Sequence, residues 1–339
     1  MTEILLAGSG HYPHLIIDFS EPGLTLRLHF PSARDCPPTQ KYRHSAPAPA
    51  MTSNLEPVRT GATLEYITVD VFTRQRYYGN PLAVVLVPTA LSGQISGDVK
   101  QRIAREFNLS ETVFLHVPDT SSALRSKSLT ICTSIPAPWL TPCGISPSSL
   151  TTPSLRSAHA AIDASLSLDE SIRKAELQAP LVSIVKGMTA LLVKLPNLEL
   201  LSRVSTASRL RFDEPIQDLL LDKGPWGSSF CYRYYYVPLE DSDGSKSDDR
   251  ADVRRLRARM VELASEDPAT GSAAVTLGAY LAMQEHADQK AIRFEITQGV
   301  EMGRQSEIAV EVKLKSRAKI EEIYLGGSAV IVMNGVINI

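Results

Sequence analysis

The hydrophobic pattern becomes regular from Thr63 onward. Residues 66–72 alternate between apolar and polar positions, which is typical of a β-strand with one buried face. A continuous apolar run at residues 82–87 predicts a second strand, and the turn residues Gly79-Asn80-Pro81 lie between the two. This first region therefore begins with two neighbouring strands.

A helix is predicted after these strands. Val99, Ile103 and Phe107 recur every four residues, so they would form one apolar stripe on a helix. Ser96 is a suitable N-cap and Asn108 suits a left-handed C-cap. Glu111 follows this cap and opens a further predicted strand over residues 112–117.

The second half of the chain also combines short strands with one dominant helix. Ala274, Leu277 and Leu281 would line one face of this helix. Strands are predicted at residues 188–195, 230–237, 291–297, 307–314 and 329–333. The acidic segment 240–252 is predicted to be an exposed loop. Such a mixture indicates an α+β architecture.

Two regions lack this regularity. Residues 1–61 have no convincing period, and we interpret them as a disordered or mis-annotated N-terminal extension; their histidines match no metal-site spacing. Residues 126–160 are atypical for this chain. Ser, Thr and Pro crowd residues 126–157, which are therefore predicted to form no regular core element and to be poorly ordered.

Composition narrows the classes of function. The 339 residues leave room for two domains, and 43% apolar residues support a packed core. A net charge of -2 with scattered Lys and Arg argues against nucleic acid as a partner, and no apolar run is long enough to span a membrane. The four cysteines lack zinc-site spacing and predict reduced thiols in a cytoplasmic protein. No nucleotide-binding glycine motif or ligand cluster is present, so neither metal nor cofactor is expected.

Candidate chemistry concentrates at residues 265–274. Two carboxylates and a Thr-Gly-Ser turn lie directly before the predicted helix. The free N–H groups of a helix N-terminus can hold a substrate carboxylate, and Asp267 beside them could move a proton. Thr270 or Ser272 could instead cap these N–H groups, and an ordinary capped helix is the alternative interpretation. Glu111 lies at the corner between the helix that ends at Asn108 and the strand predicted at residues 112–117. Its side chain could point into a cleft or be a surface carboxylate.

Three ordered signatures resemble the phenazine-biosynthesis isomerase-like (PhzF-like) family, which shares the fold of diaminopimelate epimerase. The resemblance covers residues 65–118 and 186 to the end. The signatures are Asp70-Val71-Phe72-Thr73 with Tyr78-Gly79-Asn80-Pro81-Leu82-Ala83-Val84-Val85 and Asn108-Leu109-Ser110-Glu111, then Glu266-Asp267-Pro268-Ala269-Thr270-Gly271-Ser272, then Gln298-Gly299-Val300-Glu301-Met302-Gly303-Arg304.

The resemblance implies two pseudo-symmetric domains, 62–185 and 186–339, each a curved mixed sheet around a central helix. It implies cofactor-independent proton transfer that isomerises a small molecule bearing a carboxylate, in biosynthetic secondary metabolism. By the family's motifs, Glu111 would be the main acid/base and Asp267 its catalytic partner. Thr270, Gly271 and Ser272 would bind substrate, with Asp267 and Ser272 facing Glu111 across an interdomain cleft.

One departure leaves the activity open. Family members carry a Gly-His-Pro motif where this chain has the atypical region 126–160, and that motif is missing here. The chain could be an active isomerase, a catalytically impaired relative that binds a small molecule or a protein, or a normal enzyme whose sequence is mistranslated or mis-spliced in this region. Expected partners are the small carboxylate and a second copy in a homodimer, with neither nucleic acid nor membrane.

Overall fold

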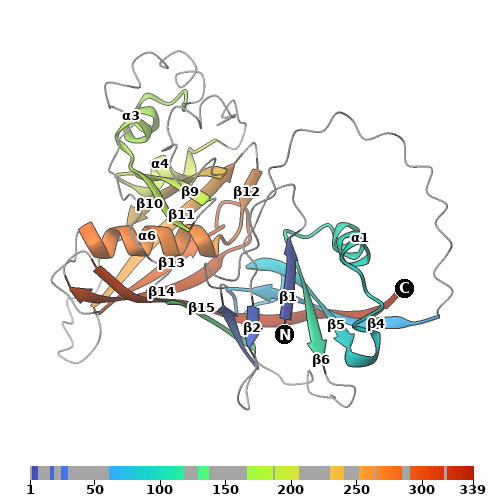
Figure 1. Ribbon diagram of the computed structural model, residues 1–339. Coiled ribbons are helices and arrows are strands. Elements are labelled where there is room, and N and C mark those ends of the chain that lie inside the picture. Colours follow the sequence, from blue (N-terminus) through green and yellow to red (C-terminus); the bar gives the residue numbers. More distant parts are fainter. Residues whose placement is uncertain are drawn as a thin grey trace, which may run out of the picture.

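The computed structural model describes residues 61–117, 129–136, 166–185, 188–205, 230–239, 252–262, 265–284, 291–316 and 319–339, together with three short strands before residue 30 (Figure 1). Strands dominate, and a few helices cover their faces, so the predicted α+β class is confirmed. Within these residues no helix is both long and apolar enough to cross a membrane.

The first half is built as the pattern predicts. Strand β4 (Thr63–Val71) runs antiparallel to β5 (Asn80–Pro88), and β5 runs parallel to β6 (Glu111–Val117). Helix α1 (Gly97–Phe107) makes the crossover after the short helix η1 (Thr89–Leu91). Its N-cap Ser96 accepts a hydrogen bond from the N–H of Val99, and Asn108 ends it with a φ of 49°. Both predicted caps are confirmed.

The sheet continues into segments where no regular structure was expected. Strand β1 (Thr2–Leu6) pairs with β6, β2 (Ile16–Asp18) pairs with β3 (Leu24–His29), and β3 pairs with β7 (Leu129–Pro136). The expectation that residues 126–157 form no regular element is therefore wrong for β7. Its residues Leu-Thr-Ile-Cys-Thr-Ser-Ile are rich in β-branched side chains, and its single proline is its last residue. Strands β1, β2 and β3 likewise contradict a disordered extension over their own residues. The rest of residues 1–60 and residues 137–160 lie outside the described residues, so the predictions for them stay predictions.

The second half is a larger mixed sheet. The strands follow the spatial order β4-β15-β14-β13-β11-β10-β9-β8, with β12 paired to β11. They span Leu181–Val185 (β8), Met188–Lys194 (β9), Phe230–Pro238 (β10), Asp252–Glu262 (β11), Ser265–Asp267 (β12), Ala291–Gln298 (β13), Ser306–Ser316 (β14) and Lys319–Asn338 (β15). The last strand is far longer than predicted, because it pairs with β14 at one end and with β4 at the other. It thereby joins the two halves (Figure 1).

Helix α6 (Gly271–Gln284) is the central helix of the second half. It contacts strands β8, β9, β13, β14 and β15, and it is drawn in orange above the sheet in Figure 1. The sequence predicted one apolar face, but Ala273 to Ala279, Leu281 and Ala282 are all buried. The helix is therefore apolar almost all round, as expected for a helix enclosed by a curved sheet.

Two helices that the sequence did not predict cover the opposite face of this sheet. Helix α3 (Glu170–Gln178) packs on β9, and α4 (Leu198–Ser202) packs on β10 and β11. Successive tyrosines of β10 point to the two faces: Tyr234 joins the core around α6, whereas Tyr235 joins the core beneath α3 and α4. The central helix predicted for the first half falls outside the described residues, and the domain boundary near residue 185 stays a prediction.

Candidate active site

Glu111 lies at the corner between α1 and β6. The left-handed Asn108 ends the helix, and Glu111 is the first residue of the strand, paired in register with Leu82 of β5. The hydroxyl of Ser110 donates to the side-chain oxygen of the buried Asn80 over 3.1 Å and so ties this corner to the start of β5. Among the described residues, no hydrogen bond reaches the Glu111 carboxyl group.

Asp267 lies at the end of β12, directly before α6. Its pairing with Met260 of β11 fixes the backbone. The Thr270 hydroxyl donates to Asp267 Oδ2 over 2.7 Å, and the N–H of Ala269 donates to Oδ1 over 3.3 Å. The Asp267 carboxylate is therefore held in a tight turn by hydrogen bonds from the residues that directly follow it.

Thr270 takes the N-cap position of α6, since its carbonyl accepts the N–H of Ala274 over 3.0 Å. Its hydroxyl is directed to Asp267 and does not cap the helix, contrary to the capping role considered from the sequence. No hydrogen bond from the described residues takes up the N–H groups of Gly271 and Ser272. These two amides are thus available to an anion at the helix N-terminus.

The first half of the chain packs against this helix start through Phe72. A Cβ atom added to Gly271 would lie 2.8 Å from Leu325 Cδ2 and 3.8 Å from Phe72 Cζ. A Cβ atom on Gly327 of β15 would lie only 2.4 Å from the Phe72 ring. Glycine at position 327 therefore lets Phe72 approach the backbone of β15 closely, and glycine at position 271 makes room for Leu325, with Phe72 in ordinary van der Waals range of the helix start.

Both carboxyl groups have raised pKa values. Burial raises the pKa of Glu111 from 4.5 to about 7, and the charge of nearby Asp267 adds to the rise. Burial also raises the pKa of Asp267 from 3.8 to about 6, with the hydrogen bonds from Thr270 and Ala269 opposing it. Both residues nevertheless keep intermediate solvent exposure, so each lies near the surface while protein surrounds most of its charge.

The charge interaction between the two groups enters the titration of Glu111 and not that of Asp267. The order of ionisation explains this difference. Asp267 loses its proton near pH 6, while Glu111 is still neutral and exerts no charge; Glu111 then ionises beside a carboxylate that is already negative. Between these two pKa values the pair therefore holds one proton, on Glu111.

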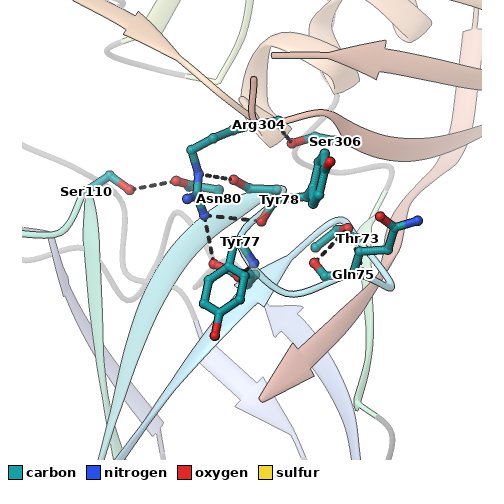
Figure 2. Close-up of polar contacts among 10 residues, drawn as sticks. Thr73, Gln75, Tyr77, Tyr78, Asn80, Ser110, Arg304 and Ser306 are labelled. Carbon is teal, nitrogen blue, oxygen red and sulfur yellow. Dashed lines mark hydrogen bonds and ion pairs between the residues drawn. The ribbon is translucent and has the colours of Figure 1, made fainter. Parts of the chain in front are cut away.

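Arg304 connects the loop after β13 with the loop between β4 and β5 (Figure 2). Its guanidinium donates to Asp70 Oδ1 over 2.8 Å and to the carbonyls of Gly79 and Tyr78 over 2.9 and 3.2 Å. The Asp70 side chain is only 5% exposed, and its other oxygen accepts the N–H of Tyr77. This ion pair, buried on the side of Asp70, joins two segments 234 residues apart, one from each half of the chain.

Two residues beside Asp267 were missed as site residues. Gln298, fully buried at the end of β13, contacts the Asp267 turn, and Tyr234 of β10 contacts Gln298. The sequence shows Gln298 within a recognised motif and Tyr234 within a run of aromatic residues, but neither pattern assigns a role. Among the described residues, no group of three or more His, Cys, Asp or Glu could hold a metal ion.

Comparison with known proteins supports the family resemblance. Residues 69–130 and 245–335 match the family described as "Phenazine biosynthesis-like protein". An uncharacterized isomerase of Mesorhizobium japonicum is 54% identical over 57 residues, which are 17% of this chain and 18% of that protein. An uncharacterized isomerase of Pasteurella multocida is 48% identical over 60 residues, which are 18% and 19% of the two chains. The chain thus aligns with less than a fifth of the length of these relatives.

The fold is similar to that of a Bacillus anthracis phenazine biosynthesis protein of the PhzF family. That crystal structure aligns with a TM-score of 0.51 and 19% sequence identity, covering 82% of this chain and 100% of the other. The family match and the shared fold confirm the resemblance to the PhzF-like family.

Proposed function

We propose that the chain is a cofactor-independent isomerase that moves a proton on a small metabolite bearing a carboxylate. Glu111 and Asp267 would be its acid/base pair. The observation that carries this proposal is their arrangement: two carboxyl groups from opposite halves interact, and their pKa values of about 7 and about 6 lie near neutrality. Groups with such values can both take and return a proton at neutral pH.

The start of α6 supports a carboxylate-bearing substrate. The N–H groups of Gly271 and Ser272 are available there, next to the Asp267 turn, and the positive end of the helix dipole favours a negative charge. A substrate carboxylate bound at this point would fix the orientation of its neighbouring carbon relative to the acid/base pair. Thr270 would contribute by holding Asp267, to which its hydroxyl donates.

Within this proposal, Glu111 and Asp267 have complementary protonation states. Between pH 6 and 7 Glu111 keeps its proton and can act as an acid, whereas Asp267 is ionised and can act as a base. An isomerisation that removes a proton at one carbon and delivers one to another can use both states at once. The chemistry requires no oxidant, reductant or electron acceptor.

Proton exchange with the solvent tests the proposal. The full chain would be incubated in D₂O with small α-amino acids, α-hydroxy acids and a cyclic unsaturated hydroxy amino acid, and loss of C–H signals followed by NMR. With a substrate identified, we expect Glu111→Gln to slow exchange at least about 10²-fold, the size of a general acid–base contribution. Glu106→Gln, an exposed change on α1, is the matched control. Exchange by the Glu111→Gln variant at the wild-type rate would show that Glu111 is not the acid/base.

A binding module is the second candidate, because the Gly-His-Pro motif of the family is absent from this chain. The same panel separates the two functions. A binding module would show ligand-detected NMR contacts with a small carboxylate, weakened by Ser272→Pro, which removes an N–H of the first turn, but no exchange of C–H protons. An isomerase would show both.

A further inference from the structure

A buried chain of hydrogen bonds leads from Tyr234 to Asp267 and has a defined direction. The side-chain oxygen of Gln298 lies 2.9 Å from the Tyr234 hydroxyl and 3.3 Å from the backbone nitrogen of Thr270. Because a backbone N–H can only donate, the atom facing it must be the amide oxygen. Burial raises the pKa of Tyr234 well above its ordinary value, so its hydroxyl keeps the proton that it donates.

The orientation of this amide fixes its other end. Nε2 of Gln298 donates to the backbone carbonyl of Asp267 over 2.8 Å and to Thr270 Oγ1 over 3.0 Å. A backbone carbonyl can only accept, so the atom facing the Asp267 carbonyl must be the amide nitrogen of Gln298. This agrees with the oxygen assigned from the N–H of Thr270. Gln298 is fully buried, and each of its side-chain polar atoms has two partners.

The last bond of the chain follows from the same accounting. Thr270 Oγ1 accepts from Gln298, so its own hydrogen must point to another acceptor, and Asp267 Oδ2 lies 2.7 Å away. Oδ2 is thereby kept as an acceptor. The opposite oxygen, Oδ1, has only the longer 3.3 Å bond from the N–H of Ala269.

We propose that Gln298, supported by Tyr234, is a positioning residue that holds the Thr270 hydroxyl as a donor to Asp267 Oδ2 and leaves Oδ1 as the oxygen that exchanges a proton. This inference rests on the proposed acid/base role of Asp267. It adds which oxygen reacts and which residues behind the site select it. The proton would be taken up at Oδ1, whereas protonation of Oδ2 would oppose the donated hydroxyl hydrogen.

The other titratable groups near Asp267 do not explain what favours its ionised form. Glu111 of β6 is the acidic neighbour, and it titrates after Asp267. Tyr234 of β10 is neutral at working pH. The charge interaction with its neighbour Tyr232 raises the pKa of Tyr234. The donors from Thr270 and Ala269 are therefore the groups that favour the ionised form of Asp267.

The test is a direct titration of Asp267 in the full chain labelled with ¹³C at the aspartate carboxyl carbons, with the resonance assigned through Asp267→Asn. In Gln298→Met the Thr270 hydroxyl can turn and accept from a protonated Asp267. We expect the apparent pKa of Asp267 to rise by about one unit in Gln298→Met and by about half a unit in Tyr234→Phe. Phe fills nearly the same space as Tyr, so a packing role alone would not produce this rise.

Tyr235→Phe is the matched control. Tyr235 neighbours Tyr234 on β10, is equally buried and donates to the Glu176 carboxylate over 2.6 Å, but on the opposite face of the sheet. Its loss should lower the unfolding temperature as Tyr234→Phe does, yet leave the Asp267 titration unchanged. If Gln298→Met fails to fold, Tyr234→Phe decides the question.

The inference is overturned if the folded Tyr234→Phe variant titrates Asp267 as the wild type does, or if Tyr235→Phe shifts it equally. Because the titration needs no substrate, its outcome is independent of the proposed activity. A chain that shows the expected shifts but exchanges no C–H proton would disprove the isomerase and retain the positioning role of Gln298. A chain that exchanges C–H protons but shows unshifted titrations would support the isomerase and disprove the positioning role of Gln298.

Discussion

Glu111 and Asp267 have similar burial but different surroundings. Asp267 closes a tight turn and receives hydrogen bonds from Thr270 and Ala269, whereas no described residue donates to the Glu111 carboxyl. Burial raises both pKa values, and only at Asp267 is the rise opposed by donors. Most of the gap of about one unit is the ordinary difference between glutamate at 4.5 and aspartate at 3.8, and the donors at Asp267 and the charge beside Glu111 account for the rest.

The local structures account for this difference. Asp267 precedes a helix N-terminus, where backbone N–H groups and a cap hydroxyl are concentrated. Glu111 begins a strand whose backbone is committed to pairing with Leu82 and its neighbours on β5. A turn therefore offers donors to its carboxylate, whereas the end of a strand offers few.

The largest expected effect that tests this comparison concerns stability. The folded-state pKa of Glu111 lies above its ordinary value, so the folded chain binds this proton more tightly than the unfolded chain. Stability contributed by this proton is lost as pH rises from about 4.5 through about 7. Glu111→Gln has no such loss, and we expect it to exceed the wild type by up to about 3 kcal/mol at pH 8.5.

Urea unfolding at pH 5.5 and 8.5 measures this effect. The advantage of Glu111→Gln should grow between the two values, while Asp267→Asn should gain less, because it weakens the hydrogen bond from Thr270. An advantage of equal size at both pH values would contradict a raised Glu111 pKa. Loss of exchange activity together with gain in stability would be the signature of a carboxyl group kept for function.

The elements defined by local signals could be predicted from the sequence. Strands β4 and β5, the two caps of α1 and the start of α6 agree with their patterns, because turn residues, a cap serine and a left-handed Asn each act within a few residues. Strand β11 could not be predicted, because its arginines obscure the alternation of apolar and polar residues. One of them, Arg259, is buried and forms a two-pronged ion pair with Glu266.

The site could be predicted only in part. Family motifs located Glu111 and Asp267, but their electrostatic contact depends on pairing between distant strands. Residues 111 and 267 are brought together by β15, which continues from the second sheet into the first, and by the Arg304–Asp70 ion pair. The role of Gln298 depends on hydrogen-bond partners at residues 234, 267 and 270, which no short pattern reveals.

The next effect in size concerns the contact between the halves. Arg304→Gln would leave the 5% exposed Asp70 carboxylate with the N–H of Tyr77 as its only remaining donor among the described residues. Because Arg304 is itself 30% exposed, we expect a loss of about 2 kcal/mol, below the cost for a fully buried pair. Arg76→Gln is the control: Arg76 also links this loop to β15, through an exposed 2.9 Å bond to the Ile331 carbonyl, and should cost less than about 0.5 kcal/mol.

Urea unfolding of the two variants measures this difference, and equal losses would show that the buried pair contributes nothing beyond a surface hydrogen bond. The titration of Glu111 in Arg304→Gln gives a second readout. If Arg304 holds the halves together, Asp267 should influence Glu111 less in this variant, so the pKa of Glu111 should fall slightly below the wild-type value of about 7.

The smallest expected effect isolates the charge interaction itself. Asp267→Asn removes the negative charge and keeps the shape of the side chain, so the pKa of Glu111 should fall from about 7. Burial is the larger cause of the rise, and the pKa should therefore fall by less than about one unit and stay above 4.5. A titration of the ¹³C-labelled glutamate carboxyl carbons measures the shift, with the exposed Asp98→Asn on α1 as the charge-matched control. A Glu111 titration unchanged by Asp267→Asn would show that the two carboxyl groups do not interact, and the acid/base pair would then have to be abandoned.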